Sequence, residues 1–152
     1  MPGYASTIPV LTNSDAVTDD GACTLREAIT VANTDTASGA SAGECPAGSG
    51  SDTINVPAMT IALGSRLKIS SPIALVGNGV GNTIVDGQRH NMVFFIMAGQ
   101  VTLQGITIQG GGGIWNQGTA YIVRRAHVPI SGRWNGGSED VRWAGPSCLL
   151  SP

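Results

Sequence analysis

The chain has 152 residues and a net charge of −2, with 41% hydrophobic and 12% charged residues. This length suits one domain with a modest core, and the apolar, weakly charged composition argues against intrinsic disorder. The basic residues are scattered, which gives no electrostatic case for binding nucleic acid or an anionic membrane. The 22 glycines, with many Thr, Ser and Asn, predict many turns between short strands.

Cysteine usage suggests an oxidising compartment. The three cysteines are Cys23, Cys45 and Cys148, and we expect Cys23 and Cys45 to form the one disulfide. Neither belongs to a CxxC pair or lies near a histidine, so we expect no zinc site and no cofactor. We expect Cys148 to be incidental.

Two further features bear on localisation. Residues 1–10 lack the basic start and apolar stretch of a signal peptide. No apolar run approaches the roughly 20 residues that span a bilayer. We therefore expect a secreted or cell-surface protein whose N-terminus is trimmed or truncated in this chain.

A short apolar run, Thr7–Leu11, precedes the turn-rich stretch Thr12–Ala22. This stretch carries oxygen ligands without the spacing of a calcium loop: Asn13, Asp15, Asp19 and Asp20. We expect them to be solvated turn residues, with no metal bound.

A helix is predicted to start after Thr24. The Thr24 hydroxyl can cap the first turn, and Glu27 can reach back to the Thr24 amide, completing a capping box. One face is apolar, formed by Leu25, Ala28, Ile29 and Ala32. The opposite face is polar, formed by Arg26, Glu27, Thr30 and Asn33. A helix this short must lie on an apolar surface.

The partner of Arg26 is left open between Glu44, backbone carbonyls in the first coil, and solvent. A polar loop, 34–51, follows the helix, and a disulfide from Cys45 to Cys23 would pin it at the helix start. Closing that loop contributes about 3 kcal/mol in the chain-entropy model.

From Asp52 onward the apolar residues follow a strand period. The dyads are Ile54/Val56, Ile61/Leu63, Leu67/Ile69, Ile73/Leu75, Val101/Leu103 and Ile106/Ile108. Apolar positions recur at a spacing of about 20–25 residues, which is typical of a solenoid of stacked coils. This recurrence aligns Ile61 with Ile84 and Ile106, and Ile73 with Phe94. Gly105 is expected to supply a bend between two strands of one coil.

The alternative fold is an antiparallel β-sandwich. It favours two-residue hairpins of the Asn-Gly type, and Asn78-Gly79 is the one such dipeptide in the coil region, 52–119. The solenoid is therefore the preferred prediction.

The segment Asp20-Gly-Ala-Cys-Thr-Leu-Arg-Glu-Ala-Ile29, followed by Ala32-Asn33, Cys45 and Asp52-Thr-Ile54, resembles the CSLREA-type domain, with Thr24 in place of the usual Ser. The continuation Asn82–Gly87, Gly105–Ile108 and Gly111–Asn116 is similar to the opening coils of the proteins that carry this domain. The resemblance implies the N-terminal part of a bacterial secreted or surface protein with a right-handed parallel β-helix of the pectate-lyase-like kind. It implies an all-β solenoid fragment with an N-terminal capping α-helix, and no defined reaction.

The resemblance implies a division of the chain into three regions. Residues 1–51 are expected to form a cap, residues 52–119 two or three coils, and residues 120–152 an irregular tail. The tail departs from the family pattern, and a shifted reading frame across Ala120–Val123 could encode Leu-Thr-Leu-Ser. Our hypothesis is that the tail is a frameshift product or the ragged end of a gene fragment; the alternative is a genuine irregular segment.

Candidate chemistry is sparse. Asp86-Gly-Gln-Arg-His90 brings an acid, a cation and a base together, but an Asp-Gly turn with solvated neighbours explains it. A glycosidase needs two carboxylates, and Asp86 stands alone among the coils. An ice-binding face would need threonines in register on every coil, and the candidates follow no strict repeat: Thr53, Thr60, Thr83, Thr102 and Thr107.

These observations favour a non-catalytic capping and scaffold segment acting as an adhesin, a stalk or a carbohydrate-binding unit. The expected partners are a carbohydrate or cell-surface ligand, and a second copy joined through the C-terminal coil. The alternative is the N-terminal fragment of a polysaccharide lyase or hydrolase whose active coils lie downstream.

Overall fold

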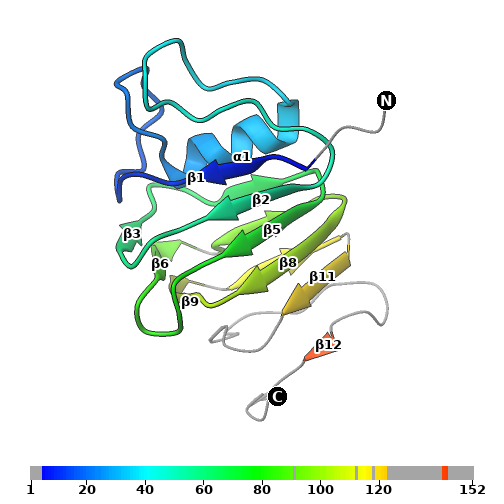
Figure 1. Ribbon diagram of the computed structural model, residues 1–152. Helices are drawn as coiled ribbons and strands as arrows, with labels where there is room; N and C mark the ends of the chain where they lie inside the picture. Colours follow the sequence, from blue (N-terminus) through cyan, green and yellow to red (C-terminus); the bar gives the residue numbers. More distant parts are fainter. Residues whose placement is uncertain (1–4, 91, 112, 118, 123–141, 144–152) are drawn as a thin grey trace.

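A computed structural model of the protein describes residues 5–90, 92–111, 113–117, 119–122 and 142–143 (Figure 1). The described part contains one helix, α1 (Leu25–Thr34). Its strands are β1 (Thr7–Pro9), β2 (Asp52–Asn55), β3 (Thr60–Ala62), β4 (Leu67–Ile69), β5 (Ile73–Val76), β6 (Ile84–His90), β7 (Phe94–Ile96), β8 (Gln100–Gln104), β9 (Thr107–Gly111), β10 (Ile114–Asn116), β11 (Thr119–Ile122) and β12 (Arg142–Trp143). No helix in this part is long and apolar enough to cross a membrane.

The strands form three parallel sheets. Their orders are β1-β2-β5-β8-β11-β12, β10-β7-β4 and β3-β6-β9. From β2 to β11 the chain visits these three sheets in turn and then returns to the first. The prediction of a β-rich fold is confirmed, and the described pairings are all parallel. The antiparallel sandwich is therefore wrong for the described residues.

The core consists of side chains stacked from strand to neighbouring strand. Three of these stacks are Ile54–Leu75–Leu103, Ile61–Val85–Ile108 and Leu67–Phe94–Ile114. Every member is at most 5% exposed. Six of these nine residues belong to the predicted apolar dyads, in which alternate residues of a strand face the same side, whereas Val85, Phe94 and Ile114 do not.

The predicted alignment of coils is wrong in detail. Ile61 pairs with Val85, Ile84 pairs with Thr107, and Ile73 lies in a different sheet from Phe94. The turns between strands differ in length, so the coils do not repeat at a fixed spacing. A slip of one residue exchanges inward and outward positions, so apolar recurrence alone does not set the register.

Gly105 supplies the predicted bend between β8 and β9. Its φ is +65°, and a Cβ there would lie 2.9 Å from the carbonyl oxygen of Gly77 in the neighbouring coil. Gly79, from the dipeptide that would suit a hairpin in the alternative sandwich fold, donates its amide to the Gly105 carbonyl at 2.8 Å. Asn78-Gly79 therefore lies in the turn that leads from β5 to β6, which belong to different sheets.

The predicted boundary between coils and tail falls within β11. This strand pairs with β8 and also with β12. Most of the predicted tail, including Cys148 and Val123, lies outside the described residues, so the frameshift remains a hypothesis.

Candidate capping interface

The start of α1 contains the predicted capping box. The Glu27 amide donates to Thr24 Oγ1 at 3.2 Å, and the Thr24 amide donates to Glu27 Oε2 at 3.0 Å. Thr24 has extended backbone angles, with φ −87° and ψ 164°. These two bonds satisfy backbone amides that a helix start leaves unpaired.

Glu27, which the sequence places on the polar face of the helix, is buried, with 2% of its surface exposed. Its Oε1 accepts the Thr18 amide at 2.8 Å, and the Thr24 hydroxyl donates to the Ala16 carbonyl at 2.9 Å. The stretch 12–22 therefore covers the outer side of the first helical turn. Helical periodicity misses this burial because a loop, not a core element, provides the cover.

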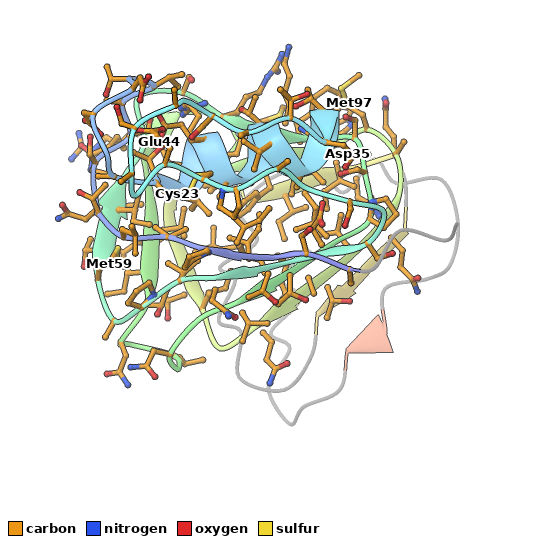
Figure 2. All side chains as sticks on the ribbon, turned by 45° about the horizontal axis from the view of Figure 1, so that its top comes forward. Cys23, Asp35, Glu44, Met59 and Met97 are labelled. Carbon is orange, nitrogen blue, oxygen red and sulfur yellow. A yellow bond between two sulfur atoms is a disulfide. The ribbon has the colours of Figure 1, made fainter. Side chains whose placement is uncertain are left out.

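A disulfide joins Cys23 to Cys45 behind the helix start, as predicted. Both cysteines are at most 1% exposed, and their Cα atoms are 4.7 Å apart. The Cys23 amide donates to Gly43 at 3.0 Å, and its carbonyl accepts from Leu11 at 2.8 Å. The pair thus connects the end of β1, the helix start and the 34–51 loop. Figure 2 places Cys23 at the start of α1 and Asp35 at its end.

The apolar face of α1 packs against the first strands. Leu25, Ala28, Ile29 and Ala32 are all at most 2% exposed, as predicted, and Val31 is 1% exposed. Figure 1 shows α1 lying across the end of the molecule at β1 and β2. The helix therefore covers the apolar interior at this end.

Asn33 covers the free edge of β4, the edge strand of its sheet. Its Nδ2 donates to the Lys68 carbonyl at 2.9 Å, and its Oδ1 accepts the Ser70 amide at 2.9 Å. The side-chain amide thus provides one donor and one acceptor, as a neighbouring strand would. An edge occupied in this way is not available for pairing with another chain.

Arg26 continues the cover along the same edge. Its guanidinium donates to the Ser65 carbonyl at 2.8 Å and the Arg66 carbonyl at 3.2 Å. It also forms an ion pair with Asp15 at 2.8 Å. Of the predicted partners, the backbone carbonyls are confirmed.

Glu44 is not a partner of Arg26. It accepts the Asp20 and Gly21 amides at 2.9 and 2.7 Å, and it also accepts the Ser38 hydroxyl at 2.6 Å. Glu44 thereby links the stretch before α1 to the loop after it. Asp15, which the sequence assigned to a solvated turn, instead pairs with Arg26 and accepts the Gly64 amide at 2.7 Å.

The remaining acids of the 12–22 stretch hold loop amides. Asp19 accepts the Ala40 and Ser41 amides at 3.2 and 2.9 Å. The pKa of Asp19 is lowered, first by its hydrogen bond with the Ser41 side chain and then by these backbone amides. Within the described residues, no group of three or more His, Cys, Asp or Glu side chains could hold a metal ion.

Asp86 to His90 lie within β6 rather than in a simple turn. The pairing with β9 is irregular there, and Gln88 and Arg89 have φ of +50° and +65°. Asp86 accepts the Gln88 amide at 2.8 Å and Gln109 Nε2 at 3.1 Å. The Gln88 amide and then the Gln109 side chain lower the pKa of Asp86. A carboxylate with a lowered pKa is a weak general base at neutral pH.

The threonines do not form one face. Thr53 and Thr102 share a row of their sheet, but Ala74 stands between them. Thr83 and Thr107 are buried, and Thr83 donates to the Pro57 carbonyl at 2.8 Å. Strand propensity and turn bonding therefore account for these residues.

A groove that the sequence did not predict lies between α1 and β4, with a volume of about 390 Å³. It is lined by Val17, Arg26, Ile29, Thr30, Asn33, Ser65, Arg66, Leu67 and Lys68. The one available signal was the alternation of Arg66 and Lys68, which places one cation directly before β4 and one on its outward face.

Comparison of the chain with protein-family models, with curated proteins and with solved structures found no match. The functional argument therefore depends on the geometry described above.

Proposed function

We propose that this chain is the capped N-terminal part of a right-handed parallel β-helix, and that it serves as a non-catalytic scaffold in a secreted or cell-surface protein. Three parallel sheets visited in turn, with inward side chains stacked from strand to strand, support this architecture. In a solenoid the terminal coil exposes an apolar interior and unpaired backbone groups. A cap must cover both.

The observation that carries the proposal is the occupation of the β4 edge by side chains of α1. Asn33 bonds the backbone of Lys68 and Ser70, and Arg26 bonds two further carbonyls. The same helix covers the apolar interior with Leu25 and Ile29. At the edge of the long sheet, β1 is short and contains Pro9, which limits strand addition there.

The resemblance to the CSLREA-type domain supports the same function. The residues that carry the resemblance also build the cap: Cys23 forms the disulfide, Thr24 and Glu27 form the capping box, and Arg26 binds the strand edge. The buried disulfide favours a protein that folds in an oxidising compartment outside the cytosol. The wider role is then that of a stalk, an adhesin or a carbohydrate-binding unit.

The test is the oligomeric state of a variant with an uncovered edge. The double variant Arg26→Gln/Asn33→Ala removes the bonds to β4, whereas Thr30→Ala/Thr34→Ala changes two exposed positions of the same helix. We expect light scattering over a wide concentration range to show concentration-dependent association of the first variant beyond that of the wild type and the control. Equal association of all three would contradict the capping function.

A second measurement addresses the non-catalytic role. The purified chain is incubated with polyuronates, and absorbance reports unsaturated products. We expect no release. Release by this chain would favour the alternative, a polysaccharide lyase.

A further inference from the structure

The groove between α1 and β4 has an apolar floor and a basic rim. Val17 is 64% exposed at its mouth, and Ile29 and Leu67 lie along its floor. Such a surface suits a ligand with an apolar face and attached polar groups.

Cations are concentrated at this groove although the chain as a whole is acidic. Arg26, Arg66 and Lys68 line it, and they are three of the four basic residues whose side chains the structure describes. Arg26 is neutralised by Asp15. Among the described residues, Arg66 and Lys68 have no carboxylate partner.

Seven of the eight acids of the described part are engaged elsewhere, and the eighth, Asp35, forms no ion pair with Arg66 or Lys68. The seven engaged carboxylates accept hydrogen bonds from backbone amides or side-chain donors: Asp15, Asp19, Asp20, Glu27, Glu44, Asp52 and Asp86. An anion that neutralises Arg66 and Lys68 must therefore come from outside this set.

Arg66 is held ready for such an anion. Its guanidinium lies over the ring of Phe95, 5.1 Å from the centroid. The attraction to the ring and a contact of one guanidinium nitrogen with Met92 Sδ at 3.8 Å restrain this side chain, whose remaining donors match a carboxylate or sulfate. Phe95 pairs in register with Lys68, so the second cation lies on the adjacent strand.

An extended peptide is a poor fit. Peptides that bind a sheet edge do so by adding a strand, and Asn33 and Arg26 already occupy the edge of β4. A sugar ring needs no such pairing, because its C–H face can lie on the exposed Val17 side chain while its charged substituents reach the rim.

We propose that this groove binds an oligosaccharide that carries carboxylate or sulfate groups, with Arg66 and Lys68 contacting the anionic groups. The ligand class rests on the carbohydrate-binding role proposed above. The site is on the outer surface beside the cap and does not depend on any downstream coil.

The test is calorimetric titration of the full chain with three probes of similar length: a dextran sulfate oligomer, an oligogalacturonate and neutral dextran. We expect at least one anionic probe to bind and the neutral one not to bind; the two anionic probes distinguish sulfate from carboxylate. The variant Lys68→Gln should weaken binding about five- to tenfold, because it removes one charge-assisted contact. Arg89→Gln removes the same charge outside the groove and should leave the affinity unchanged.

A second variant guards against loss of fold. Val17→Asp adds an anion at an exposed groove position, and we expect it to abolish binding with an unchanged melting temperature. The proposal is overturned if no anionic sugar binds, if Lys68→Gln and Arg89→Gln have equal effects, or if polyglutamate of the same charge binds equally well. None of these outcomes alters the association test of the cap, so the two proposals can fail separately.

Discussion

The side-chain amide of Asn33 lies beside the backbone of Lys68, with Nδ2 donating to the Lys68 carbonyl at 2.9 Å across 35 residues of sequence. Oδ1 of the same side chain accepts a hydrogen bond from the backbone amide of Ser70. One helical side chain thus completes two hydrogen bonds of an edge strand. This contact fixes α1 against the first coil and leaves fewer backbone groups available to another molecule.

Asn33→Ala should lower the free energy of unfolding by about 0.5–1.5 kcal/mol, since two hydrogen bonds at a partly solvated edge are replaced by water. Thr34→Ala, at the neighbouring exposed position, is the control and should change stability much less. Urea unfolding followed by circular dichroism measures both. An equal effect of the two variants would show that the edge contact adds no stability.

Removing the disulfide with Cys23→Ala/Cys45→Ala should destabilise the protein by about 3 kcal/mol, because the unfolded chain regains the entropy of an open loop. The proteins with and without the disulfide both carry Cys148→Ala, which removes the third thiol. Urea unfolding of the disulfide-containing and disulfide-free proteins gives the difference. A difference below about 1 kcal/mol would mean that native contacts alone hold the 34–51 loop.

Gly105→Ala should be more destabilising than Gly81→Ala. Both glycines have positive φ, +65° and +83°, so each substitution incurs about 1–2 kcal/mol of backbone strain. A Cβ at Gly105 would also lie 2.9 Å from the Gly77 carbonyl oxygen, whereas one at Gly81 meets nothing within 4 Å. Thermal unfolding of the two variants isolates the cost of the close approach between coils, and equal melting temperatures would contradict it.

Asp86 should make the protein less stable in acid. Its pKa is lowered by the Gln88 amide and the Gln109 side chain, so the folded state favours the ionised carboxylate. The resulting stabilisation is present above the unfolded pKa of about 3.9 and is lost as the pH falls through the lower folded value. Asp86→Asn should therefore reduce the fall in melting temperature between about pH 5 and about pH 2.

The charge control for this measurement is Asp35→Asn, which removes one carboxylate at the exposed end of α1. Its pH profile shows the effect of net charge alone. If the Asp86→Asn and Asp35→Asn profiles coincide, the hydrogen bonds to Asp86 do not contribute to acid stability.

The sequence by itself determined the features that depend on near neighbours. Thr24 and Glu27 stand at the spacing of a capping box, and the apolar dyads mark the inward side of the strands that carry them. The Cys23–Cys45 disulfide was also expected from the sequence, in which Cys45 lies in the loop after the helix and Cys148 lies in the tail. These features follow from local geometry.

Tertiary structure alone decided which distant groups meet. Arg26 could have paired with Glu44, and only the docking of α1 on β4 brings it to Asp15 and two carbonyls. Glu27 is buried because a loop folds over it, and the groove exists because Arg66 and Lys68 face the flank of α1. Turn lengths set the register between coils, and a pattern of apolar residues does not encode the path of a turn. Contacts between coils therefore required the folded chain.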